Sequence, residues 1–402
     1  MNVVVAQSGG PTSVINASLL GVYRQALQWE GVQTVYGSRN GIEGILNGNL
    51  VPLNEHIRSD EDMALLRQTP AAVLGSCRHK LPPPEQDPAV YAKIHEQLER
   101  YRIGAFFYIG GNDSMDTVYK LSSYFQSVDC PVRVIGVPKT IDNDLMGTDH
   151  TPGYGSAAKF VATGMLEIIR DCSVYDLDSV TIVEIMGRDT GWLTAAAALP
   201  RLNGEQAPHL VYLPEVPFSV SRFVEDVCRV QQHSRNVIVA VSEGVDIDAV
   251  GEYQSGKVDN FGHKYLSGVG KCLEDIVRTR IGCKVRSVEL NILQRCAAHI
   301  CSRTDVEEAE QVGAAAVRAA MDGATGEVAV FRRRSDAPYL VDFGHVPVAQ
   351  VANLVKYVPR EWINEAGNNV TEAALRYIRP LVQGELPLYT VNGLPKHFRL
   401  LK

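Results

Sequence analysis

The sequence has no excess of basic residues and no long apolar run. Its 402 residues include 39 Lys and Arg against 46 Asp and Glu, which gives a formal net charge of −7. Proteins that wrap nucleic acid usually carry the opposite sign, so we expect no nucleic-acid partner. No apolar stretch approaches the roughly 20 residues that a transmembrane helix needs, so we also expect no membrane association.

The eight cysteines form no recognisable motif. None stands in a Cys-x-x-Cys pair, and no histidine accompanies them at the spacing of a zinc finger. The N-terminal residues 1–5 lack a basic segment and the chain turns polar at Gln7, which indicates a strand rather than a signal peptide. We therefore expect free thiols and a cytoplasmic location.

Short β-branched strands alternate with glycine turns and helical patterns along the chain. Because these strands are continuously apolar rather than alternating, they are typical of parallel strands buried on both faces of a sheet. Helices are predicted where apolar residues recur at helical spacing, at 14–27, 114–125 and 191–199. The predicted fold class is α/β with mostly parallel sheets. The predicted strands are 3–6, 103–109, 132–137, 180–185 and 237–241.

The length predicts more than one domain, since a domain has about 150 residues. We place a first domain at residues 1–145 and a second at 146–402. The C-terminal segment either stays with the second domain or crosses back to the first. The arginine triplet at 332–334 is expected to be a solvated strand end.

A polar or glycine-rich turn follows each predicted strand. Any one of these turns can be an ordinary strand-to-helix connection, but ligands of parallel sheets bind beyond the carboxyl ends of the strands. Glycines in Ser8-Gly9-Gly10, before a helix, would let backbone N–H groups approach an anion. Gly110-Gly111-Asn112-Asp113-Ser114 repeats this geometry and adds a carboxylate, unless Asp113 or Ser114 simply caps the helix.

The turn at 138–144 is the most informative, because it combines an ammonium, a hydroxyl and two carboxylates. Phosphoryl transfer needs a cation for the transferred group, a carboxylate to take a hydroxyl proton, and acidic groups for Mg²⁺. The turns at 186–188 and 242–244 would add an arginine and a carboxylate. Arg286 and Arg295 flank a strand-like segment at 288–293 and would either clamp a sugar phosphate or form surface salt bridges.

In this order, the motifs resemble those of phosphofructokinases, over roughly residues 1–380. The resemblance implies two α/β sandwich domains with the active site in the cleft between them, and a homodimer or homotetramer. It also implies Mg²⁺-dependent transfer of a phosphoryl group to the 1-hydroxyl of fructose 6-phosphate. The matching motifs are Ser8-Gly9-Gly10, Gly110-Gly111-x-Asp113-Ser114, Pro138-Lys139-Thr140-Ile141-Asp142-Asn143-Asp144, Met186-Gly187-Arg188, Ser242-Glu243-Gly244 and Gln294-Arg295.

The resemblance also implies a role for each matching residue. Asp142 matches the general base, and the catalytic set is completed by Asp113, Lys139 and Arg188. Metal binding falls to Asn112 and Asp144. The donor-side positions are Gly10, Arg78, Gly111 and Lys139. The positions on the side of the sugar phosphate are Thr140, Ile141, Asp142, Met186, Gly187, Arg188, Glu243, Arg286 and Arg295.

Two positions indicate which donor is used. Members of the family that use ATP usually have glycine where this chain has Asp113 and Lys139, whereas members with Asp and Lys there use pyrophosphate. Asp113 would lie where the α-phosphate of ATP must pass, so it adds bulk and like-charge repulsion. Lys139 would place an ammonium on pyrophosphate. Pyrophosphate is therefore the expected donor.

Three departures from the family pattern keep alternatives open. Asn112 stands where most members carry a metal-binding aspartate, and an amide oxygen contributes no charge. Ile292 and Ser179 replace residues that reach the sugar phosphate in many members. The alternatives are sedoheptulose 7-phosphate as the sugar, ATP as the donor, and a non-catalytic regulatory subunit.

Overall fold

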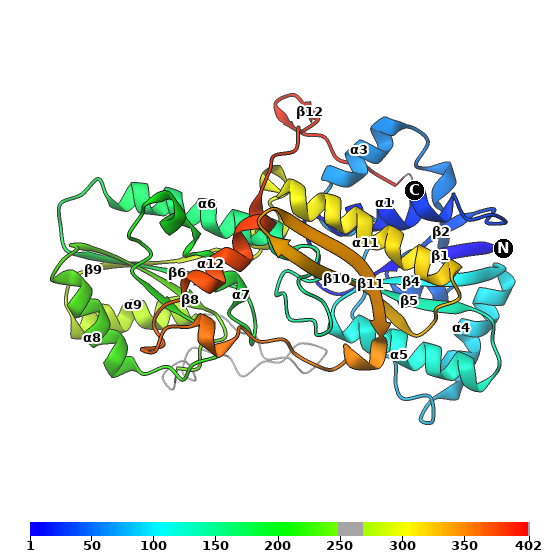
Figure 1. Ribbon diagram of the computed structural model, residues 1–402, viewed down its shortest axis with the longest axis horizontal. Helices are drawn as coiled ribbons and strands as arrows, with labels where there is room; N and C mark the ends of the chain where they lie inside the picture. The colour runs from blue at the N-terminus through cyan, green and yellow to red at the C-terminus, as the bar shows by residue number, and fades with distance from the viewer. Residues whose placement is uncertain (248–267, 401–402) are drawn as a thin grey trace.

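Two β-sheets organise the computed structural model, which describes residues 1–247 and 268–400 (Figure 1). The strands of the first sheet are, in spatial order, β11 (Tyr339–Pro347), β10 (Glu327–Asp336), β5 (Arg133–Pro138), β4 (Ile103–Gly110), β1 (Asn2–Gln7), β2 (Val35–Ser38) and β3 (Leu50–Pro52). Those of the second sheet are β7 (Leu210–Tyr212), β8 (Asn236–Ser242), β6 (Ser179–Ile185) and β9 (Lys284–Glu289). All pairs are parallel except β2 with β3 and β10 with β11. The five predicted strands are confirmed.

Helices cover both faces of each sheet because consecutive apolar residues point to opposite sides. On the first sheet, Val3 and Val5 pack on one face, and Val4 and Ala6 pack on the other. One face is covered by α1 (Ile15–Ala26), α3 (Asp60–Gln68) and α11 (Arg303–Met321), and the other by α2 (Ile42–Leu46), α4 (Pro88–Arg100) and α5 (Asn112–Ser127).

The second sheet is covered in the same way. One of its faces carries α6 (Tyr154–Cys172), α7 (Trp192–Ala196) and α12 (Glu372–Ile378), and the other carries α8 (Val220–Gln231) and α9 (Val269–Arg280). The short helix α10 (Leu293–Cys296) and the hairpin of β12 (Thr390–Val391) and β13 (Leu394–Pro395) complete the α-helices and strands of the described residues. Among the helices of the described residues, none combines the length and the hydropathy that a membrane crossing requires.

The first sheet is completed by residues far along the chain. Strands β10 and β11 belong to it and helix α11 packs against it, although the predicted boundary assigns all three to the second domain at 146–402. Helix α11 packs closely on α1 because each helix has a glycine at the contact. A Cβ atom on Gly21 would lie 1.9 Å from the Glu310 carbonyl oxygen, and one on Gly313 would lie 2.3 Å from that of Ser18.

Two local predictions differ from the structure. The strand expected at 288–293 ends at Glu289, because Asn291 adopts a left-handed conformation with φ of 43° and the chain turns into α10. The arginine triplet is solvated at Arg332 and Arg334 only, since alternate residues of β10 face opposite sides. The Arg333 side chain is 10% exposed and donates to Asp149 Oδ1 at 3.0 Å.

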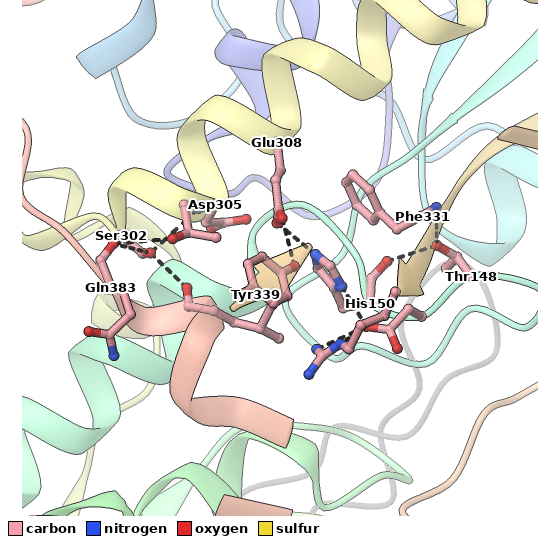
Figure 2. A network of polar contacts seen from close by, with 12 residues as sticks. Thr148, His150, Ser302, Asp305, Glu308, Phe331, Tyr339 and Gln383 are labelled. Atoms are coloured by element: carbon pink, nitrogen blue, oxygen red, sulfur yellow. Dashed lines mark hydrogen bonds and ion pairs between the residues drawn. The ribbon is translucent and has the colours of Figure 1, made fainter. Parts of the chain in front are cut away.

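A buried polar network joins α11 to the loop after β5 and to β11 (Figure 2). His150 lies between two carboxylates, with Nε2 2.7 Å from Glu308 Oε2 and Nδ1 2.8 Å from Asp149 Oδ1. Its ring stacks on Phe331, and the Tyr339 hydroxyl donates to Glu308 at 2.6 Å. Burial would lower the pKa of His150, but Glu308 and Asp149 together raise it above its usual value.

This network predicts a pH-dependent contribution to stability. We expect Glu308→Gln to lower the free energy of unfolding by about 1.5–3 kcal/mol near pH 6, because a charged hydrogen bond is lost. Because the pKa of His150 is raised in the folded state, its protonation stabilises the fold. This contribution is complete below the histidine pKa of the unfolded chain, about 6.5, and disappears as the pH rises through the pKa of the folded state. Urea unfolding at a series of pH values measures the effect. The exposed Glu307→Gln is the control, and an equal loss in both variants would contradict the assignment.

Candidate active site

The carboxyl ends of strands from both sheets open onto one cleft of about 940 Å³. The turns after β1, β4 and β5 form one wall, and those after β6, β8 and β9 form the other. This is the convergence expected for parallel strands. All predicted site residues except Arg286 line the cleft: Gly10, Arg78, Gly111, Asn112, Asp113, Lys139, Thr140, Ile141, Asp142, Asp144, Met186, Gly187, Arg188, Glu243 and Arg295.

Arg286 lies outside the cleft of its own chain. It stands in the first half of β9, whereas Glu289 at the end of that strand lines the cleft. Its guanidinium pairs with Asp171 at 3.4 Å, in a separate hollow beside α6. Arg295 instead reaches the turn after β1, where its Nη1 would be 3.5 Å from a Cβ atom on Gly10.

Lys139 brings a buried ammonium to the first glycine turn. Its side chain is 2% exposed, and Nζ donates to the Gly10 carbonyl at 2.7 Å. Gly9 has φ of 74°, a conformation that favours glycine, and a Cβ atom there would lie 3.2 Å from Nζ. Burial lowers the pKa of Lys139 to about 8, although the negative charges of Asp142 and Asp144 oppose this shift.

The second glycine turn leads into α5, whose N-terminus opens onto the cleft. The residue that caps α5 is Gly111, which offers no side-chain hydrogen bond, so the alternative in which Asp113 or Ser114 caps the helix is wrong. Asp113 Oδ1 lies 3.8 Å from Lys80 Nζ, and both residues line the cleft. The carboxylate of Asp113 therefore faces the cleft together with a nearby cation.

The loop after β5 carries two carboxylates of interest. Thr140 Oγ1 accepts from the Asp142 backbone N–H at 3.1 Å and lies 3.4 Å from Asp142 Oδ2, which shapes the loop as a tight turn. Burial raises the pKa of Asp142, and Arg188 opposes the rise. Burial and the charge of Asp142 raise the pKa of Asp144 to about 6. A cation bound at this loop would therefore be favoured.

The turn after β6 is held by side chains from the second sheet and by the loop after β5. Glu243 Oε1 accepts from the backbone N–H groups of Gly187 at 3.1 Å and Arg188 at 3.0 Å. Gln294, next to Arg295, accepts from the Met186 backbone N–H at 2.9 Å. The Thr190 hydroxyl donates to the Asp142 carbonyl at 3.1 Å. The arginine and the base candidate are therefore fixed relative to each other.

The cleft also contains residues that the sequence motifs did not indicate. Lys80 could have been found in the basic run that begins at Arg78, but Asn353 and Val355 carry no such signal. They come from the segment after β11, and Asn112 binds this segment with both side-chain atoms. Its Nδ2 donates to the Leu354 carbonyl at 2.6 Å, and its Oδ1 accepts from the Asn353 backbone N–H at 2.6 Å.

The protein ligands for a metal ion are few. Within residues 1–247 and 268–400, no three His, Cys, Asp or Glu side chains gather into a metal site. Mg²⁺, however, is usually held by one or two carboxylates together with substrate phosphates. Asp144 in the cleft fits this requirement. Asn112 Oδ1 would bind the metal while it still accepts the hydrogen bond from the Asn353 backbone N–H.

Comparison with known proteins shows the family of the chain. The model of the Phosphofructokinase family matches residues 2–320. A pyrophosphate–fructose 6-phosphate 1-phosphotransferase from Halomonas elongata is 40% identical, with 100% of this chain and 96% of that protein covered. One from Xanthomonas campestris pv. campestris is 41% identical, with 99% and 96% covered. The crystal structure of a pyrophosphate-dependent phosphofructokinase from Nitrosospira multiformis has a TM-score of 0.88 and 35% identity, covering 99% of this chain and 96% of that one. The chain belongs to the phosphofructokinase family.

Proposed function

We propose that the protein transfers a phosphoryl group reversibly from pyrophosphate to the 1-hydroxyl of fructose 6-phosphate, giving fructose 1,6-bisphosphate and phosphate. The observation that carries the proposal is the pair Lys139 and Asp113, which line the same cleft as the base candidate Asp142. The names of the full-length relatives support the same reaction.

Asp142 is the proposed general base. It would accept the proton of the 1-hydroxyl as that oxygen bonds to the phosphorus and the second phosphate departs with the bond electrons. Burial raises its pKa and so makes the carboxylate a stronger base, while Arg188 opposes protonation. Arg188 would also bind phosphate oxygens, because a guanidinium matches their geometry.

Lys139 and Asp113 would select the donor. The buried ammonium of Lys139, next to Gly10, would neutralise charge on pyrophosphate without any contact to a nucleoside. Asp113 at the start of α5 would repel the additional phosphate of a longer donor. Asp144, with Asn112, would hold Mg²⁺. When bound, this ion supplies positive charge for the phosphoryl oxygens.

The donor assignment predicts a change of preference in Asp113→Gly. We expect the parent to form fructose 1,6-bisphosphate with pyrophosphate and little with ATP. In Asp113→Gly, the ratio of kcat/KM for ATP to that for pyrophosphate should rise at least about tenfold, which corresponds to about 1.4 kcal/mol. Asp129→Gly, an exposed change just after the same helix, is the control. A parent that uses ATP better than pyrophosphate would refute the donor, and a preference for sedoheptulose 7-phosphate would refute the sugar.

The proposed base predicts a large loss of turnover in Asp142→Asn. The amide cannot accept the hydroxyl proton, so kcat should fall by about 10²–10⁴-fold while the KM for each substrate changes little. Steady-state kinetics with both substrates measures this split, and circular dichroism checks that the variant is folded. A folded variant whose kcat stays within tenfold of the parent would rule out Asp142 as the base.

The pKa of Lys139 predicts an alkaline limit to activity. Because only the protonated ammonium neutralises phosphate charge, kcat/KM for pyrophosphate should fall as the pH rises through about 8. In Lys139→Arg this limb should move above pH 9, since a guanidinium stays charged. Profiles of kcat/KM between pH 6 and 10 test the prediction. The assignment fails if the limb is the same in both proteins.

A further inference from the structure

The segment after β11 runs along the loop that carries the proposed base. Val355 forms an antiparallel bridge with Leu145, and the Lys356 backbone N–H donates to the Asp144 carbonyl at 2.8 Å. The Lys356 carbonyl accepts from Trp192 Nε1 at 2.8 Å. The segment therefore connects the loop after β5 to α7, which packs on the second sheet.

The ammonium of Lys356 has an acceptor for each of its three protons. It donates to Asn143 Oδ1 at 3.2 Å, to the Thr148 carbonyl at 3.2 Å and to the Asp149 carbonyl at 2.7 Å. It also lies 5.2 Å from the centre of the Trp192 ring. Lys356 is not among the residues that line the cleft, so it would act on the reaction through the residues that it contacts and through its charge near Asp144.

Asn143 is the neighbour that connects Lys356 to the reaction. It stands between Asp142 and Asp144, is fully buried, and has φ of 54°. Asparagine adopts the left-handed conformation more readily than most other non-glycine residues, and in the buried interior the contacts of its side chain hold it there. Here Lys356 holds the side-chain oxygen, while the nitrogen donates to the Tyr377 hydroxyl at 2.9 Å.

We propose that Lys356 is a positioning residue, which holds Asn143 in its left-handed conformation and thereby fixes Asp142 and Asp144 in the cleft. The inference rests on the proposed function only in so far as Asp142 and Asp144 serve the reaction. A displacement of about 1 Å of a reacting group costs about 10²-fold in rate, so the loss of a contact outside the cleft can lower kcat.

The first test compares Lys356→Met with the exposed control Lys93→Met. We expect kcat to fall by about 10²-fold in Lys356→Met, with KM values within about threefold, because the cleft surface itself is unchanged. Lys356→Gln keeps a donor for Asn143 and should lose less. If Lys356 acts through Asn143, adding Lys356→Met to Asn143→Gly should cost much less than it costs in the parent. Full additivity, or a kcat equal to that of Lys93→Met, would overturn the proposal.

The second test does not depend on turnover. Amide hydrogen exchange in peptides covering 140–149 should be at least about tenfold faster in Lys356→Met than in the parent, while peptides from β1 and α11 stay unchanged. Unchanged exchange in 140–149 would overturn the proposal even if kcat falls. A parent that is inactive with every donor would refute the proposed function, and the exchange data would still decide the role of Lys356.

Discussion

The balance of charge around Asp142 and Asp144 is the constraint on which the cleft depends. Burial raises the pKa of both carboxyls, and each carboxylate lies in the field of other acids. Arg188 opposes the rise at both, and Lys139 opposes it at Asp142. The two acids in turn oppose the fall of the Lys139 pKa. Acidic and basic groups around the cleft therefore favour one another's charged forms.

The side chains that carry these charges are held in place by contacts from both halves of the molecule. The loop after β5 is tied at one end by the bridge between Thr140 and Gly153, and at the other by the bridge between Leu145 and Val355. The turn after β6 is docked onto the same loop through Thr190 and is shaped by Glu243. The loop that carries the proposed base is therefore one place where the two halves of the molecule are joined.

Much of the cleft could be predicted from the sequence because its pattern is local. Continuously apolar strands such as β4 and β8 indicate parallel sheets, and parallel strands bring their carboxyl ends to one edge. The turns after those strands were therefore expected to meet, and they do. The resemblance added roles to residues such as Asp142 and Lys139. It did not indicate that Arg286 faces away from the cleft of its own chain.

The α/β class, the strands and the polar turns follow from the sequence, since buried strands have a recognisable apolar pattern and turns have their own residue types. The distant groups that support the site emerge only when the chain is folded. The sequence predicts a solvated Arg333, whereas the position of β10 in the first sheet places this side chain against Asp149. Lys356 and Asn143 are 213 residues apart, and a contact of that kind leaves no periodic signal in either segment. The two residues come into contact only when the C-terminal part of the chain packs on the loop after β5.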